Sequence, residues 1–185
     1  MIERKDFVQD DFADSQEWGE VTKIANSLES LLSNDVAQDA IQFANQPGKS
    51  SALVQATFLK EAQILGFEDE SKGLFASYQS LLRPDYFRRV GKSGIILEVE
   101  RGKTTINNMD LLDFWKCHIC EYADYLFLLV PRELRQNETM KPKKEYPYVV
   151  KRLETFLNPV ITQMSEGWFC SDTDWCLIEG VNYLG

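Results

Sequence analysis

Histidine is almost absent from this chain, and several common catalytic signatures are missing altogether. The 185 residues include one histidine, His118, which is set among apolar neighbours. With one histidine and no G-x-S-x-G segment, the sequence gives little support to a hydrolase with a catalytic triad. It also has no G-x-x-x-x-G-K-[ST] and no G-x-G-x-x-G, so nucleotide-binding loops of these kinds are not expected. We interpret His118 as a structural residue.

The sequence also lacks a hydrophobic run long enough to cross a bilayer. The longest apolar stretch, residues 123–131, is interrupted by Asp124, whereas a membrane-spanning helix needs roughly 20 apolar residues. The first residues, MIERKDFVQDDFAD, have no apolar segment typical of a secretory signal. We therefore expect a cytoplasmic protein without a membrane partner.

Cysteine is present, but its spacing is not typical of a zinc site. The four cysteines are Cys117, Cys120, Cys170 and Cys176, and in the cytoplasm they should be reduced. The first pair lies in a helix-like stretch, where cysteine is a common small core residue. A zinc site built from the two pairs is the less favoured alternative.

The chain is acidic, with a net charge of −9, which by itself argues against a nucleic-acid partner. The charge is unevenly distributed, however. Residues 1–45 hold ten acidic and three basic residues, residues 83–103 hold six basic and three acidic, and residues 132–152 hold seven basic and three acidic. Phosphate binding depends on local charge, so the two basic segments remain compatible with DNA or RNA. Each could also be an ordinary solvated face.

Hydrophobic periodicity predicts a single α/β domain. Helices are expected over 15–33, 35–45, 50–65, 108–122 and 146–157, and strands over 85–90, 95–100, 123–131 and 175–179, while residues 68–82 fit either type. We divide the domain into an N-terminal helical extension (1–48), a core (50–131) and a C-terminal helix and tail (132–185).

The chemically informative residues are Asp85, Glu98 and Glu100. Side chains alternate along a strand, so Glu98 and Glu100 should share one face. A turn over residues 91–94 should fold the Asp85 strand back beside them. Carboxylates gathered at the end of an apolar strand need a positive partner, and Mg²⁺ is a natural one because it prefers oxygen ligands. We therefore expect the three carboxylates to converge on one point.

This segment, PDYFRRVGKSGIILEVE, with the helix and buried strand that follow it, resembles the PD-(D/E)XK nuclease superfamily, which includes the type II restriction endonucleases. The resemblance covers about residues 50–131. It implies a restriction-endonuclease-like fold, a mixed β-sheet flanked by helices. It also implies an endonuclease that hydrolyses phosphodiester bonds in double-stranded DNA, with Mg²⁺ or Mn²⁺ as cofactor, and that acts as a homodimer. The metal would be bound by Asp85, Glu98 and the carbonyl oxygen of Val99, with Glu61 as a further acidic ligand from the preceding helix.

The sequence departs from the family motif at Glu100, where most members carry lysine. Lys103 and Lys116 are candidates for a displaced catalytic lysine. Glu61 can equally well be interpreted as an acid at the edge of the apolar face of its helix, paired with a nearby arginine. The basic residues expected to hold DNA phosphates are Arg83, Arg88, Arg89, Arg101 and Lys103. The basic residues of 83–103 and 132–152 should flank one cleft that contains the acids, and the acidic helices of 1–45 should lie away from it.

Three other interpretations remain open. The protein could be a catalytically silent nucleic-acid-binding or regulatory protein on the same fold. The acidic N-terminal helices would also suit a protein-interaction module. Finally, residues 85–100 could form an ordinary hairpin with Glu98 and Glu100 on a solvated face.

Overall fold

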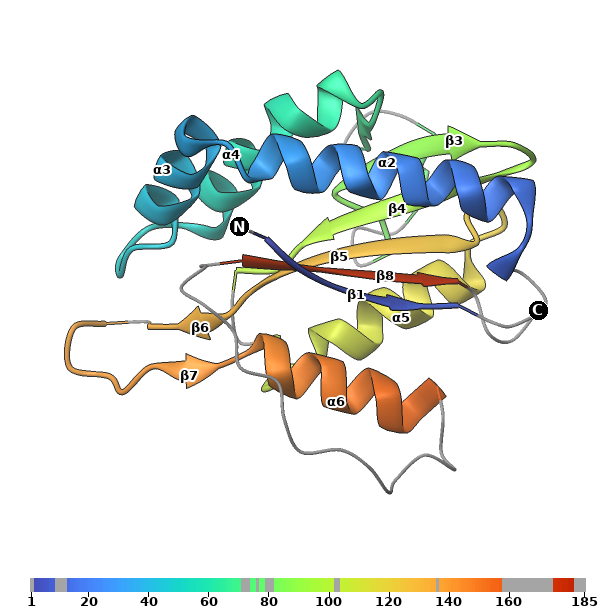
Figure 1. Cartoon of the computed structure of the whole chain (residues 1–185). Helices are drawn as coiled ribbons and strands as arrows, with labels where there is room; N and C mark the ends of the chain where they lie inside the picture. The colour runs from blue at the N-terminus through green and yellow to red at the C-terminus, as the bar shows by residue number, and fades with distance from the viewer. Residues whose placement is uncertain are drawn as a thin grey trace.

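A mixed six-stranded sheet lies between two groups of helices in the computed structural model of this chain (Figure 1). The structure describes residues 2–8, 13–70, 74–75, 77–78, 82–101, 104–135 and 137–157, and the backbone of 175–181. The sheet has the order β1-β8-β5-β4-β3-β2. Its strands are β1 (Glu3–Phe7), β2 (Glu68–Asp69), β3 (Tyr86–Val90), β4 (Ser93–Val99), β5 (Tyr125–Pro131) and β8 (Trp175–Val181). The helices are α2 (Gln16–Leu32), α3 (Asp35–Ala44), α4 (Ser51–Ile64), α5 (Met109–Ile119) and α6 (Tyr146–Leu157).

The centre of the sheet is a hairpin followed by a crossover. Strands β3 and β4 are antiparallel and are joined at Gly91 and Lys92, and Gly91 adopts a positive φ of 54°. Strand β4 then pairs in parallel with β5, and α5 lies between the two strands in the chain. Strand β5 pairs antiparallel with β8, which pairs in parallel with β1. The α/β class predicted from the sequence is confirmed.

Alternation along β4 divides the core into two halves. Ile95, Leu97 and Val99 pack with residues of α2 and α4, whereas Ile96 packs with residues of α5 and α6. Figure 1 shows α2, α3 and α4 over one face of the sheet and α5 and α6 over the other. By the same alternation, Glu98 points to the α5 side.

Side-chain caps explain where three of the helices begin. The side chains of Ser15, Asn34 and Ser50 each accept a hydrogen bond from a backbone N–H in the first turn of α2, α3 and α4. Such caps satisfy donors that have no partner within the helix. Ser50 therefore sets where α4 begins.

The N-terminal segment is more than the helical extension that we expected. Its first residues form β1, a strand of the main sheet. Trp18 of α2 stacks on Tyr125 of β5, with ring centroids 6.4 Å apart. An edge strand depends on a partner far away in the sequence, which local periodicity does not reveal.

Two smaller differences concern short strands. The ambiguous residues 68–82 begin with the two-residue strand β2. The basic segment after β5, to which we assigned no strand, holds a hairpin of β6 (Glu133–Leu134) and β7 (Lys143–Lys144). Within the described residues, no helix is long and apolar enough to cross a membrane.

Candidate functional site

Asp85 and Glu98 lie side by side on the β3–β4 hairpin. Tyr86 pairs with Leu97 in the antiparallel register, which places Asp85 opposite Glu98. The backbone N–H of Asp85 donates to Glu98 Oε2 at 3.2 Å, and the backbone N–H of Val99 donates to Asp85 Oδ2 at 2.9 Å. The other oxygen, Asp85 Oδ1, accepts from Gln55 Nε2 of α4 at 2.8 Å. The hairpin therefore brings the first two predicted acids together.

Lys116 reaches this pair from α5. Its ammonium lies 2.6 Å from Glu98 Oε1 and 3.0 Å from Asp113 Oδ1, one helical turn earlier. The Lys116 side chain is only 7% exposed, so these are buried ion pairs. Of the two lysines proposed from the sequence, Lys116 stands at the acids, while Lys103 lies outside the described residues.

Glu100 follows the last residue of β4 and completes a cluster of four carboxyl groups. It interacts with Asp113, with which it hydrogen-bonds when one of the two is protonated, and with Asp85. Its side chain is half-buried. Lys116 contacts Glu98 and Asp113, Asp85 lies beside Glu98, and Glu100 interacts with Asp113. We call these four acids the acidic cluster.

Burial raises the pKa of every carboxyl group in the acidic cluster. The pKa of Glu100 rises to about 8, because burial and then the charges of Asp113 and Asp85 disfavour its ionised form. The pKa of Asp113 rises to about 6, again through burial, although Lys116 opposes the shift. The pKa values of Glu98 and Asp85 are also raised by burial. One ammonium cannot balance four carboxylates, so the cluster is short of positive charge.

Lys116 is held in its charged form. Burial lowers its pKa, but the carboxylates of Glu98 and Asp113 outweigh burial, and the net shift is upward. A lysine with a raised pKa does not accept a proton near neutral pH. Lys116 can therefore donate hydrogen bonds and stabilise negative charge, but it is not a base.

The acidic cluster is not a preformed metal cage. Among the described residues, no three His, Cys, Asp or Glu side chains stand together in an arrangement that could hold a metal ion. The contacts explain this, since Lys116 occupies the space beside Glu98 and Asp85 is engaged by Gln55 and Val99. The donor set nevertheless fits a divalent cation, because carboxylate oxygens are the ligands that Mg²⁺ prefers and Asp113 Oδ2 is buried without a hydrogen-bond donor.

The α4 residue at this site is Gln55, not Glu61. The Gln55 side chain donates a hydrogen bond to Asp85, and the Gln55 backbone carbonyl oxygen accepts one from the Tyr86 hydroxyl at 2.7 Å. Glu61 lies six residues further along α4, about 9 Å along the helix axis, towards the end where the Leu65 carbonyl meets Arg88. One oxygen of Glu61 is buried without a hydrogen-bond partner.

The predicted phosphate-binding arginines do not gather around the acids. Side-chain alternation sends Arg88 to the α4 face, where it donates to the Leu65 carbonyl oxygen. Arg89 is exposed and shares the face of Asp85, but four strand residues, about 13 Å, separate them. Arg101 follows Glu100 directly and donates to the carbonyl oxygens of Lys49 and Gln46. Arg83 precedes the site and is half-buried.

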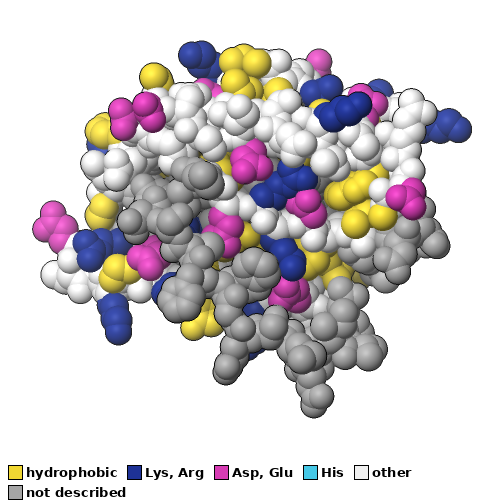
Figure 2. All heavy atoms as spheres, in the orientation of Figure 1, with side chains coloured by type: hydrophobic (Ala, Val, Ile, Leu, Met, Phe, Trp, Pro, Cys, Tyr) yellow, Lys and Arg dark blue, Asp and Glu magenta, His cyan; other side chains and the backbone are white. Residues whose placement is uncertain are grey.

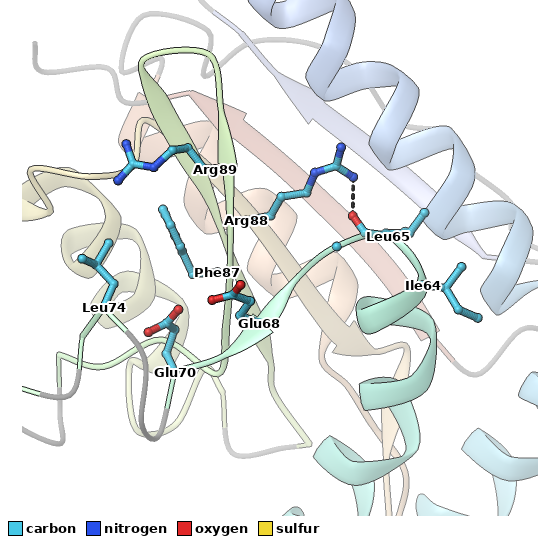
Figure 3. A pocket seen from close by; sticks show the side chains of 9 residues that line it. Ile64, Leu65, Glu68, Glu70, Leu74, Phe87, Arg88 and Arg89 are labelled. Atoms are coloured by element: carbon cyan, nitrogen blue, oxygen red, sulfur yellow. Dashed lines mark hydrogen bonds between the residues drawn. The ribbon is translucent and has the colours of Figure 1, made fainter.

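Arg88 and Arg89 instead line a separate hollow of about 680 Å³, together with Leu74, Phe87 and two acids, Glu68 and Glu70. Figure 3 shows these side chains arranged between the end of α4, β2 and β3, with Arg88 turned towards Leu65. The expectation that the basic residues of 83–103 flank one cleft containing the acids is therefore wrong for this arginine pair.

Several basic residues of 132–152 make structural contacts. Arg152 donates to the Thr105 carbonyl oxygen and to Asn108 Oδ1, and lies 3.4 Å from Asp110. Lys143 donates to Thr105 Oγ1 and pairs with Glu145. Figure 2 shows basic and acidic side chains interspersed on the visible face. Any phosphate contact must therefore come from a small local group of cations.

Cys117, Cys120 and His118 lie on or next to α5, and each has a packing role in the described structure. Cys117 and Cys120 are buried and free, as expected for core residues. Cys170 lies outside the described residues, and Cys176 belongs to β8. His118 packs edge-on against Trp115, with ring centroids 5.2 Å apart.

Sequence reasoning missed Gln55 and Asp113. A signal for Asp113 was available, because Asp110, Asp113 and Lys116 recur every three residues beside the buried Phe114 and Cys117, which places all three towards the core. Gln55 carried no such signal, since one amide on a helix surface is not distinctive. Its position emerges only from the packing of α4 on β3.

Comparison with known proteins finds no relative of this chain. No family model, curated protein or solved structure matches the chain. Its function must therefore be argued from the acidic cluster.

Proposed function

We propose that this protein is a metal-dependent endonuclease that hydrolyses phosphodiester bonds in DNA and is related in fold to the PD-(D/E)XK nucleases. One observation carries the proposal: at the end of β4, Lys116 pairs with the buried carboxylates of Glu98 and Asp113, with Asp85 and Glu100 next to them, and the pKa of each of the four carboxyl groups is raised. Perturbed pKa values with defined charge partners are typical of functional sites. An ordinary hairpin with solvated acids would not bury Glu98, whose residue is 3% exposed.

The order of elements supports the same proposal. Residues 51–131 form a helix, three antiparallel strands, a helix and a strand that is parallel to the third. The family resemblance in the sequence predicts a helix and then a strand after the hairpin, in this order. A restriction-endonuclease-like core on these elements also explains why the acids and the lysine come from β3, β4 and α5.

A divalent cation would supply the positive charge that the acidic cluster lacks. Asp85, Glu98 and the carbonyl oxygen of Val99 are the groups that would hold Mg²⁺ or Mn²⁺, and the ion would polarise the scissile phosphate and lower the pKa of a water molecule. Glu61 stands too far along α4 to join this set without rearrangement.

The directions of the pKa shifts assign different catalytic roles to Glu100 and Lys116. Glu100, with a pKa of about 8, is close to the value at which a carboxylate can accept a proton from water near neutral pH. Lys116 remains an ammonium, so its role is to stabilise the negative charge that develops on the phosphate. Glu100, at the position where most family members carry lysine, is therefore the base. Lys116, the displaced lysine, is the electrophilic group.

The test is cleavage of supercoiled and linear duplex DNA with Mg²⁺ or Mn²⁺, with EDTA as the metal-free control. The isosteric variant Asp85→Asn should lose at least about a hundredfold in rate, because charged groups that stabilise a transition state contribute several kcal/mol. Asp124→Asn is the matched control, since Asp124 is exposed at the opposite end of β5. Folding of each variant is checked by circular dichroism. Equal cleavage by folded Asp85→Asn and wild-type protein would refute the proposal.

One observation favours a second candidate, a catalytically silent nucleic-acid-binding protein on the same fold. The ion pair between Lys116 and Glu98 fills the position beside a proposed metal ligand. If that pair is permanent, isothermal titration with Mn²⁺ should show no binding while DNA is still bound. Measurable Mn²⁺ binding that is lost in Asp85→Asn excludes this candidate.

A further inference from the structure

Lys116 has two anchors, and they differ in kind. Glu98 lies on β4, accepts a hydrogen bond from the Asp85 backbone and is a proposed metal ligand. Asp113 lies on α5, on the same helix as Lys116 and three residues before it. Its side chain is 1% exposed. The bond to Asp113 is therefore local to one helix, whereas the bond to Glu98 joins the helix to the sheet.

The two anchors respond differently when a cation is bound. If Glu98 shares its charge with a metal, its contact with Lys116, 2.6 Å long, is weakened. A buried ammonium without a partner is strongly unfavourable, so Lys116 would tend to leave the site. Asp113 Oδ1, at 3.0 Å, is the remaining acceptor that can hold it. Asp113 also adjoins Glu100, so a lysine held there stays beside the proposed base.

We propose that Asp113 is a positioning residue, which keeps Lys116 at the active site once the charge of Glu98 is committed to the metal. This inference rests on the proposed function. It assigns the ion pair with Glu98 to the metal-free protein and the ion pair with Asp113 to both states. It also explains why a buried acid that the motif does not require is present on α5.

The kinetic test compares Asp113→Asn with Asp110→Asn. Both residues are fully buried acids of α5, but Asp110 faces Arg152 and not Lys116. Asp113→Asn should lower kcat roughly 10- to 100-fold, the worth of a hydrogen bond to a charged group, with the KM for DNA and the Mg²⁺ dependence unchanged. Asp110→Asn should leave kcat within a few-fold of wild type.

A double-mutant cycle separates positioning from a general structural effect. In a Lys116→Met background, Asp113→Asn should cause no further loss of cleavage, because the group that it positions is already absent. Independent losses that multiply would overturn the proposal. A changed Mg²⁺ dependence in Asp113→Asn would also overturn it, since Asp113 would then be a metal ligand.

A readout that needs neither metal nor cleavage distinguishes this inference from the proposed function. Glu98→Gln removes the charge of Glu98, as metal binding would. The ammonium signal of Lys116, assigned by its loss in Lys116→Met, should persist in NMR spectra of ¹⁵N-lysine-labelled Glu98→Gln protein and disappear in Glu98→Gln/Asp113→Asn. If the signal persists in Glu98→Gln while the wild-type protein does not cleave DNA, the nuclease is refuted and the anchor is retained. Loss of the signal in Glu98→Gln alone refutes the anchor.

Discussion

At the scale of single residues, ionisation of the carboxyl groups in the acidic cluster is unfavourable. Asp85, Glu98, Glu100 and Asp113 all have raised pKa values because burial disfavours their ionised forms. The metal-free protein therefore keeps protons on this cluster that the unfolded chain would release. A bound cation would replace those protons, so metal affinity and pH should be linked at this site.

Glu100 gives a pH prediction whose sign is fixed. Its pKa is about 8 in the folded protein, against an ordinary value of 4.5. Between these values the folded state binds more protons than the unfolded state, so the free energy of unfolding falls as pH rises. The stabilising contribution is complete below about pH 4.5 and is lost as pH passes through about 8.

Urea unfolding of wild-type and Glu100→Gln protein across this pH range, without metal, measures the effect. The free energy of unfolding of wild type should decrease relative to that of Glu100→Gln, in which the group cannot ionise. Saturating Mg²⁺ should reduce the difference. A wild-type protein that gains stability relative to Glu100→Gln with rising pH would contradict the assignment.

At the scale of elements, the β3–β4 hairpin sets the distance between Asp85 and Glu98. Gly94 lies near its turn, where an added Cβ would overlap the ring of Phe87 and stand 2.9 Å from the carbonyl oxygen of Arg88. The backbone atom cannot move without disturbing the ladder. The hairpin therefore requires glycine at this position for reasons of space.

Gly94→Ala should lower the free energy of unfolding by about 1–3 kcal/mol, the usual cost of overpacking a buried site. Gly19→Ala is the control, because Gly19 lies within α2 with open space around its Cα. That change should stabilise the protein by up to about 1 kcal/mol. Chemical denaturation measures both, and an unchanged midpoint for Gly94→Ala would show that the hairpin can shift.

At the scale of the whole molecule, a net charge of −9 opposes any polyanion. Figure 2 shows charges of both signs interspersed on one face, and two of the predicted arginines, Arg88 and Arg101, hydrogen-bond to backbone carbonyl oxygens. We therefore expect the proposed binding to DNA to depend on cations other than these two and on the proposed metal.

We expect weak duplex binding that needs a divalent cation and falls steeply with salt, because neutralised phosphates release counterions. Fluorescence anisotropy, with Ca²⁺ in place of Mg²⁺, measures the affinity from about 50 to 200 mM salt. Asp85→Asn should bind DNA without the metal more tightly than wild type, because repulsion between carboxylate and phosphate is relieved. An affinity that does not change with salt would indicate a contact of another kind.

The sequence by itself determined the local elements and the central pair of acids. Capping residues and apolar periodicity placed α2, α3 and α4 within one or two residues, and strand alternation placed Glu98 on the face opposite Leu97. These features follow from contacts between residues close in the chain, so a local pattern contains them.

Only the tertiary structure decided which distant groups meet the acids. Lys116 and Asp113 come from α5, and Gln55 comes from α4, and each contact depends on how a helix packs on the sheet. The same packing of the whole core made β1 a partner of β8. Long-range pairings are chosen by the burial of the whole core, and no short segment carries that information.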